Sequence, residues 1–569
     1  MPSEPRDRIA LTIGVTGQRD VPPECEPPLR AAFATILDDL AAACPHTPLT
    51  LLATLAPGAE TIAVAFAAER GIPIVACLPA PPDACRAALP AAERPRFDAA
   101  LAACARVETV TDAEAEDARL REAGMYVAHY CHLLVAFWDG APDPSDGALA
   151  EVVDARLLGT IGDGAVPSNL PGLPDLGPVH RIITPRPGTP PSPEPATATT
   201  YFPRRFTGDA EFQRDFDEAL HRLDQCNLDL ARLAGEPAGA ETIERLRDRI
   251  GDAASALQRT TFRFLYALYV TAVVATAAQY TSILAFKFAM FPLAFAAYRI
   301  AKRYDYENRY QDYRALSEGL RVQAAWFGAG LRDEQADRCY LGMQERELQW
   351  IRMALRYTHF AFRPAAAGGR IGDGACRDWI EGQWRYFKDK PRIEERWLRR
   401  LENASRATFW TALAVAAFLF TYLDLPPAPH AVAHALAALA TNAHVPAALA
   451  SWSAATAATV AKTNVGWSPP APGPLHAWLE RLSTGVLALY AAVALLIANY
   501  GEKRGFALNV KRYDRMFAVF DRAKRRLDAM PDPESPAGRE IVRELGRAAL
   551  IENGDWLLTR REHPLAFVN

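Results

Sequence analysis

Short apolar runs alternate with segments of helical length over the first third of the chain. Five runs have the apolar, β-branched composition of buried parallel strands, at residues 9–15, 50–56, 72–79, 132–138 and 179–185. Alanine-rich segments of helical length lie between them, at 29–43, 59–70 and 146–158. This alternation predicts an α/β, Rossmann-like parallel sheet with helices on both faces. Such sheets bind ligands in a crevice beyond the carboxyl ends of their strands.

A proline-rich segment ends this region. Residues 1–185 are the predicted ligand-binding domain, and residues 186–203, which begin "RPGTPPSPEP", are the predicted linker. In the following segment, 204–260, four apolar residues recur at helical spacing: Phe212, Phe216, Leu220 and Leu223. This spacing predicts an amphipathic cytosolic helix.

Four uncharged runs of nearly membrane-spanning length follow, at 264–286, 288–298, 407–423 and 484–500. A bilayer span needs ~17–25 residues. Apolar helices buried in a soluble core are the alternative explanation. Arginine and lysine residues flank these runs, which favours the membrane.

The charges also predict a topology. Cationic residues lie on both sides of 261–300, so this region is expected to be a hairpin of two spans with both ends inside. Between Leu425 and Leu479 the only cationic residue apart from four histidines is Lys462, so the loop 424–483 is expected outside. Segments 301–406 and 501–569 are then cytosolic helices. We expect four transmembrane helices in the inner (cytoplasmic) membrane, with both termini cytoplasmic.

Composition adds few constraints. The 569 residues carry a net charge of −4, which gives no electrostatic reason to expect a nucleic-acid partner. The nine cysteines include no Cys-x-x-Cys pair, which fits a reduced, intracellular setting. No spacing of histidine, cysteine or carboxylate residues predicts a metal site, and no cofactor is expected.

Glycines at strand ends are the candidate binding elements, because they let a phosphate or ribose approach backbone N–H groups. A tight turn is the alternative explanation of "GVTGQRD" at 14–20. Glycine-bearing loops also follow the second and fourth of the expected strands. The candidate ligand-binding residues are Gly14, Thr16, Gly17, Arg19, Gly58, Glu60, Asp139, Gly140, Gly147 and Glu151.

The first 185 residues resemble the SLOG superfamily, the Rossmann-like group that includes the DNA-processing protein DprA and the LOG phosphoribohydrolases. The Ala-x-Gly-x-Asp-like turn of that group is matched at 56–60, where Glu60 replaces the aspartate. Its Gly-Gly-Thr-x-x-Glu-like element is matched in part, by Gly147, Ala148 and Glu151. Residues 143–145, Asp-Pro-Ser, stand where further glycines precede that element in the hydrolases, which favours binding over hydrolysis.

The membrane half resembles SLATT-type transmembrane effectors of bacterial conflict systems, in the helical hairpin followed by residues 313–331 and in "CRDWIEGQWRYF" at 376–387. The two resemblances imply a homo-oligomeric anti-phage membrane effector that a nucleotide-derived second messenger gates. Arg19 would then neutralise phosphate, and Glu60 and Glu151 would accept hydrogen bonds from ribose hydroxyls or orient an amide. The alternative is a membrane-tethered nucleotide N-glycosidase or phosphoribohydrolase. There, Glu151 would stabilise an oxocarbenium ion, and Glu60 or Asp139 would position water.

Overall fold

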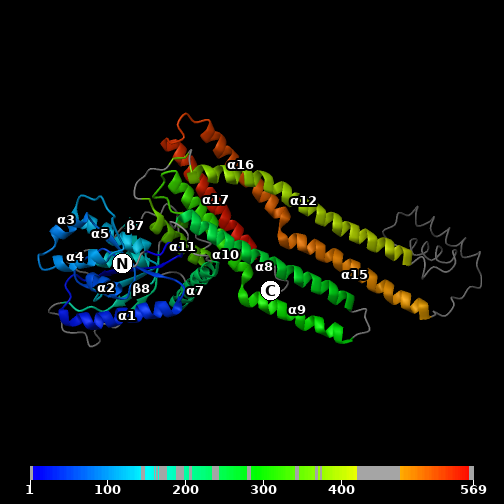
Figure 1. Cartoon of the computed structure of the whole chain (residues 1–569), viewed down its shortest axis with the longest axis horizontal. Coiled ribbons are helices and arrows are strands. Elements are labelled where there is room, and N and C mark those ends of the chain that lie inside the picture. The colour runs from blue at the N-terminus through cyan, green and yellow to red at the C-terminus, as the bar shows by residue number, and fades with distance from the viewer. Residues whose placement is uncertain are drawn as a thin grey trace, which may run out of the picture. The chain divides into compact units, whose positions relative to one another are not determined.

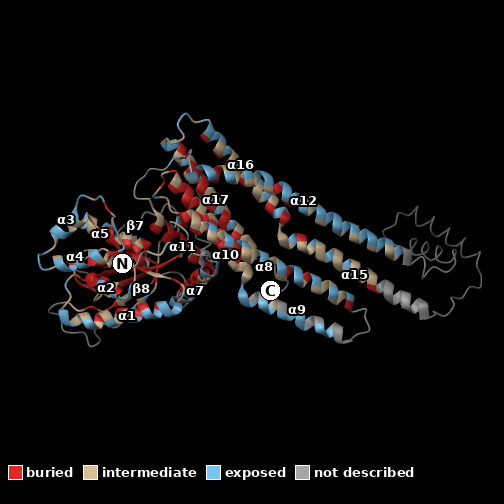
Figure 2. Ribbon diagram, in the orientation of Figure 1, coloured by how far each residue is buried: buried red, intermediate tan, exposed pale blue. Residues whose placement is uncertain are grey.

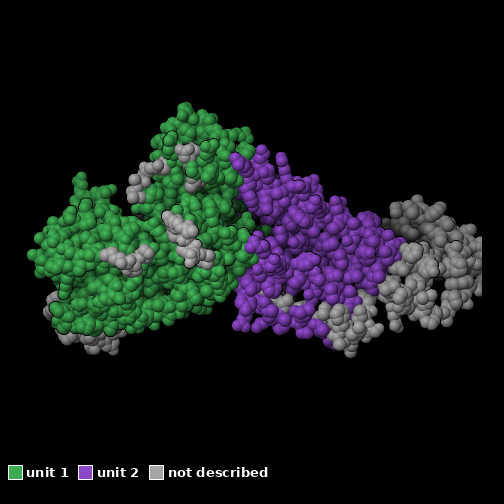
Figure 3. All heavy atoms as spheres, viewed as in Figure 1, with its two compact units in different colours: residues 1–257, 308–384, 519–562 green, residues 258–307, 385–518, 563–569 purple. Residues whose placement is uncertain are grey.

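The computed structural model describes most of the chain. The described residues are 4–141, 148–158, 160–161, 164–165, 176–186, 198–203, 208–233, 242–278, 284–339, 345–364, 370–371, 374–419 and 474–562. They fall into two compact units, which Figure 3 distinguishes by colour. The first contains residues 1–257, 308–384 and 519–562, and the second contains 258–307, 385–518 and 563–569.

A seven-stranded sheet organises the first unit, in the order β4-β3-β2-β1-β5-β8-β9. Figure 1 shows the helices and strands along the chain. All neighbouring strands are parallel except β8 and β9. The strands are β1 (Leu11–Gly17), β2 (Leu49–Ala53), β3 (Ile74–Leu78), β4 (Arg106–Thr109), β5 (Leu133–Phe137), β8 (Val179–Ile182) and β9 (Ala198–Tyr201). A separate two-stranded ribbon pairs β6 (Thr160–Ile161) with β7 (Gly164–Ala165).

The five expected strands are thus confirmed as β1, β2, β3, β5 and β8. Every residue of β1, β3 and β5 is buried, because helices cover both faces of a parallel sheet. Two edge strands were not expected. In β4 half-buried and exposed residues alternate, and β9, which lies within the segment expected as a linker, is mostly exposed.

Helices pack on the sheet in two groups, α1 with α2 and α5 with α6. The helices of the sheet region are α1 (Glu26–Ala43), α2 (Ala59–Glu69), α3 (Pro82–Ala88), α4 (Arg94–Ala103), α5 (Glu116–Tyr130) and α6 (Leu149–Leu158), with a 3-10 turn η1 (Pro23–Cys25). The three helices expected from the alanine-rich segments are α1, α2 and α6. The Rossmann-like part of the fold prediction is therefore confirmed.

Helix α7 (Asp209–Leu233) lies against the segments that precede β1 and β2, at the amino-terminal ends of these strands. The four residues that predicted it are all buried. Asn227 fastens it to the chain before β1: its Oδ1 accepts from the Ile9 N–H (2.9 Å), and its Nδ2 donates to the Ile9 carbonyl (2.8 Å). Asp224 accepts from the His46 N–H and the Thr47 hydroxyl, both at 2.8 Å.

The regular elements in the rest of the described residues are helices. The remaining elements are α8 (Ile243–Ala278), α9 (Leu284–Tyr304), α10 (Tyr306–Gly328), η3 (Ala336–Cys339), α11 (Glu345–Phe362), α12 (Gly374–Leu419), α15 (Pro474–Arg504), α16 (Phe506–Asp528) and α17 (Pro536–Glu562). The boundary between the units falls inside four of them, α8, α10, α12 and α16. Four helices therefore contribute to both units.

In the second unit, α8 packs on α15 through Tyr269. Its hydroxyl donates to Asn499 Oδ1 (2.6 Å), and its ring meets the Tyr500 ring edge-on, with centroids 5.8 Å apart. The Ser405 hydroxyl of α12 donates to the Ala494 carbonyl of α15 (3.3 Å). Hydrogen bonds from polar side chains thus join α15 to both α8 and α12, although these helices are mostly apolar here.

Two described helical stretches, Ile243–Ala278 and Gly485–Asp528, are long and apolar enough to cross a membrane, rather than the four expected. In the most apolar 18-residue segment of each stretch, only 22% is buried in the first and 11% in the second. The third expected span leaves the described residues after Leu419, and several side chains of α9 are also outside them. Figure 2 shows how little of α9 and α12 is buried.

His132 joins the sheet to α11 and is 1% exposed. The Thr12 N–H donates to its Nδ1 (3.0 Å), so the proton is on Nε2, which donates to the Met353 carbonyl (2.9 Å). Burial, followed by the Arg356 charge, lowers the His132 pKa to about 3. Burial also lowers the pKa values of His180 and His359 to about 4.

The neutral His132 predicts sensitivity to acid. The unfolded state takes up a proton near pH 6.5 and the folded state only near pH 3, so stability is full above pH 6.5 and falls as pH decreases through this window. The loss for one such group is about 1.4 kcal/mol per pH unit. We therefore compare unfolding temperatures of the full chain in detergent at pH 7 and pH 5. Between these pH values, the unfolding temperature of His132→Gln should fall less than that of the wild type.

His221→Gln is the matched control, since His221 is exposed on α7. It should follow the wild-type pH dependence. Equal pH slopes for His132→Gln and the wild type would show that His132 is not held neutral.

Candidate functional site

The order of the strands identifies one position on the sheet edge as the natural ligand crevice. β1 lies between β2 and β5, so the connections that leave β1 and β5 run in opposite directions along the sheet. Ligands bind at such switch points, outside the carboxyl ends of the strands. The Gln18 N–H donates to the Phe137 carbonyl (3.0 Å), which holds the two strand ends together. The candidate site therefore begins after Gly17 and after Phe137.

Close contacts between chain segments explain three of the predicted glycines. A Cβ on Gly14, in the middle of β1, would lie 2.8 Å from the Cys131 Cβ, so this glycine lets β1 pack against the end of α5. A Cβ on Gly17 would lie 2.7 Å from the Ala59 Cβ and 2.8 Å from the Phe137 Cβ. Gly14 is thus not at the strand end, where the ligand role was expected.

Gly58 has the strongest backbone requirement. Its φ of 85° is in the left-handed region, and a Cβ would lie 2.1 Å from the Arg19 carbonyl oxygen. The N–H of Ala59, the first residue of α2, donates to the Gln18 carbonyl (3.0 Å). The Gln18 carbonyl thus occupies the N–H of the residue that follows Gly58.

Glu60 is turned into the protein. It is 3% exposed, and its Oε2 accepts from the Thr54 N–H (2.9 Å), the Thr54 hydroxyl (2.8 Å) and the Ala56 N–H (3.3 Å). Burial raises its pKa to about 7, while these hydrogen bonds and the Arg19 charge oppose the rise. Glu60 therefore shapes the loop between β2 and α2.

Gln18 is the functional candidate that the sequence reasoning missed. It is 1% exposed, and neither its Oε1 nor its Nε2 has a hydrogen-bond partner among the described residues. A buried polar group without a partner costs ~1–3 kcal/mol, so it calls for an explanation such as a ligand that completes its bonding. Thr16, two residues before Gln18 and within β1, is 8% exposed. A polar amide directly after a buried strand was the available signal.

Arg19 follows Gln18 and is half-buried. Its guanidinium makes no hydrogen bond or ion pair with a described residue, and its charge acts on Glu60. An arginine with free donors suits phosphate, which accepts two parallel N–H bonds. The predicted role of Arg19 is compatible with this geometry.

The loop after β5 is organised by Asp139. Its Oδ1 accepts from the Ala141 N–H (2.9 Å), and its Oδ2 lies 2.7 Å from the Arg186 Nε. Gly140 has a φ of 95°, and a Cβ there would lie 2.8 Å from Arg181 Nη1. Both residues are at the expected strand end, where they hold the loop.

Glu151 opens α6 as expected, but its Oε2 pairs with Arg121 Nε of α5 at 2.9 Å. Both side chains are about half exposed. Gly147 lies outside the described residues. The structure therefore brings together the ends of β1 and β5 and the start of α2, with Gln18 and Arg19 as the groups able to bind a ligand.

No protein-family model matches the chain, and no curated protein is similar to it. Among the described residues, no group of three or more histidine, cysteine or carboxylate side chains is arranged to hold a metal ion.

We expect Glu60→Gln to stabilise the protein above pH 7. The unfolded state loses the Glu60 proton near pH 4.5 and the folded state only near pH 7, so stability falls as pH rises through this window. The cost reaches roughly 3 to 3.5 kcal/mol above pH 7. Glutamine does not ionise, and its carbonyl oxygen can accept the same three bonds.

Thermal unfolding of the full chain at pH 5 and pH 8 measures this difference. Glu60→Gln should unfold at a higher temperature than the wild type at pH 8, with a smaller difference at pH 5. The exposed Glu24 provides the control variant, Glu24→Gln, which should change neither value. A lower unfolding temperature at pH 8 would mean that the structure requires the Glu60 carboxylate.

Proposed function

We propose that this chain is a membrane effector that a nucleotide-derived second messenger gates. The ligand would bind at the ends of β1 and β5. The effector would act in anti-phage defence by forming a pore or disrupting the host membrane. The ligand part rests on two neighbouring residues at the switch point of the sheet. Gln18 is buried and Arg19 is half-buried, and the side chain of neither makes a hydrogen bond to a residue that the structure describes.

The membrane part is supported by the surface of the second unit. Each of the four helices that contain the expected spans exposes large apolar side chains to its surroundings. Examples are Tyr266 (68% exposed) on α8, Phe288 (65%) and Phe295 (64%) on α9, Trp410 (62%) on α12 and Leu495 (70%) on α15. Apolar surface of this extent is normally covered, and acyl chains are a suitable covering.

Single-residue breaks separate the apolar helices from the polar ones. Asp305, with a φ of 46°, stands between α9 and α10, and Gly505, with a φ of 65°, stands between α15 and α16. Arg504 lies over the Phe262 ring at 3.9 Å and near the Phe506 ring at 5.2 Å. Such breaks are suitable positions for a change of helix direction, because one residue carries the change.

The enzymatic alternative has less support. A glycosidase needs carboxylates that face the substrate. Glu60 bonds the loop before α2, Glu151 pairs with Arg121, and Asp139 pairs with Arg186. All three carboxylates named for that chemistry are engaged within the protein.

We expect Gln18→Leu to separate binding from folding. Leucine fills a similar volume without polar atoms, so the ligand-free variant should unfold at a higher temperature than the wild type. A screen of linear and cyclic nucleotides by thermal shift on the full chain should find a compound that stabilises the wild type. That compound should not stabilise Gln18→Leu.

Gln213→Leu on α7 is the control and should keep the response, since within the described part of the chain the Gln213 side chain bonds only Asp217, one turn along the helix. A Gln18→Leu variant that unfolds at a lower temperature and still responds to the compound would remove Gln18 from the site.

The four-span topology is tested with the chain's own cysteines. All nine lie in segments that the proposal assigns to the cytoplasm. A membrane-impermeant maleimide should therefore leave the wild type unlabelled in intact cells, and should label Ser451→Cys in the loop 424–483. After lysis, both should be labelled. Wild-type labelling in intact cells, or protection of Ser451→Cys, would contradict this topology.

A further inference from the structure

Cationic parts of several helices lie next to one another in the second unit. Arg504, at the end of α15, lies over the Phe262 ring of α8 at 3.9 Å. The Phe264 ring of α8 stacks with the Tyr306 ring at the start of α10, with centroids 5.7 Å apart. Tyr306 follows α9 after a single intervening residue. These contacts bring together the ends of α9 and α15 and the part of α8 that precedes its uncharged segment.

Helix α12 joins this group through α15. A Cβ on Gly501 would lie 3.6 Å from Leu401 Cδ1, and the Ser405 hydroxyl donates to the Ala494 carbonyl (3.3 Å). The neighbouring segments of the four helices are named the collar here, and its residues are 259–263, 299–305, 395–406 and 501–504. The collar contains eleven arginine and lysine residues and four carboxylates. It therefore has a large excess of positive charge.

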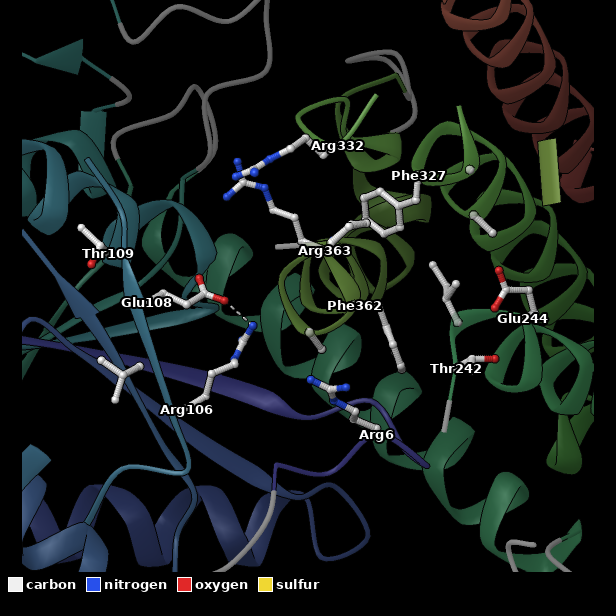
Figure 4. Close-up of a pocket in the computed structure, with 16 residues that line it drawn as sticks. Arg6, Arg106, Glu108, Thr109, Thr242, Glu244, Phe327, Arg332, Phe362 and Arg363 are labelled. Atoms are coloured by element: carbon white, nitrogen blue, oxygen red, sulfur yellow. Dashed lines mark hydrogen bonds and ion pairs between the residues drawn. The ribbon is translucent and has the colours of Figure 1, made fainter. Parts of the chain in front are cut away.

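Much of this charge is exposed and has no carboxylate partner. Four exposed collar arginines make no ion pair with a residue that the structure describes, and these are Arg259, Arg263, Arg299 and Arg303. A fifth, Arg399, pairs with Glu395 at 3.3 Å. By contrast, Arg106 of the first unit donates to both Glu108 and Glu4, beside the cavity that Figure 4 shows. The collar arginines thus remain available to an anion outside the chain.

The collar also exposes aromatic side chains. Trp397 of α12 is 50% exposed, with the Arg400 guanidinium over its ring at 5.4 Å, and Tyr304 at the end of α9 is 50% exposed. Tryptophan and tyrosine are enriched where a membrane meets water, because their rings have an apolar body and a polar group. The uncharged segments of α8, α12 and α15 adjoin the collar. Cations and aromatic rings beside apolar helices are typical of the headgroup region of a membrane.

We propose that the collar binds the headgroups of anionic phospholipids, an inference that rests on the proposed insertion of the second unit into a membrane. Guanidinium groups donate two parallel N–H bonds to a phosphate. Each arginine or lysine near an anionic leaflet adds to the attraction. A zwitterionic headgroup carries a cation beside its phosphate, so it attracts the collar less. A soluble phosphate compound would make no use of the adjoining apolar surface, which acyl chains cover.

Thermal unfolding of the full chain in detergent tests the collar with three probes: dioctanoyl phosphatidylglycerol, dioctanoyl phosphatidylcholine and glycerol 3-phosphate. The anionic lipid should raise the unfolding temperature saturably, and the other two should not. The double variant Arg263→Gln/Arg303→Gln should need about tenfold more anionic lipid, or higher, for half of the shift, because two cationic contacts are lost. Both side chains are exposed and make no ion pair with a described residue, so this variant should unfold like the wild type without lipid.

Arg96→Gln/Arg232→Gln is the matched control, since it removes the same charge from two exposed arginines of the first unit. It should keep the wild-type response. Equal stabilisation by phosphatidylcholine or by glycerol 3-phosphate, or equal weakening in the control, would overturn the inference.

Carbonate extraction of cell membranes tests the proposed spans separately. A chain that resists extraction but shows no preference for the anionic lipid contradicts the collar alone. A chain that carbonate releases contradicts the proposed membrane effector, and the collar with it.

Discussion

The close approach of the chain after β1 to the first turn of α2 is the constraint on which the sheet edge depends. Gly17 and Gly58 permit it, since a Cβ at either position would lie within 3 Å of the facing segment. The Ala59 N–H then bonds the Gln18 carbonyl and fixes the backbone. Because that backbone is fixed, the Gln18 side chain is held in a buried position that its own chemistry does not favour.

Comparison of three buried polar residues indicates which of them serve the fold. His132 uses both ring nitrogens, and Glu60 uses one oxygen for three hydrogen bonds. The polar atoms of both residues have hydrogen-bond partners, so a structural role accounts for their positions. Gln18 has four hydrogen-bonding positions and no partner among the described residues, so its burial is uncompensated. Equal burial thus indicates a structural role where the polar atoms have partners, and a candidate binding role where they have none.

The central strands could be predicted because a strand covered on both faces is apolar throughout its length. β4 and β9 could not, since edge strands such as "RVET" and "ATTY" carry polar residues and resemble loops. At the candidate site, the glycines were recognised, but their contacts are with Cys131, Ala59 and Arg19. No sequence pattern shows that two segments approach within van der Waals distance, or that an amide lacks a partner.

The proposed gating requires that binding favours one arrangement of the helices over another, since a ligand that binds both equally shifts nothing. Reversing a 1:99 equilibrium takes about 5.5 kcal/mol of differential binding. Completing the bonds of the Gln18 amide and pairing Arg19 supplies energy of this order, at ~1–3 kcal/mol per contact. Four helices continue from the first unit into the second, and single-residue breaks at Asp305 and Gly505 limit where direction can change. These four helices therefore connect the first unit to the proposed spans without interruption at the unit boundary.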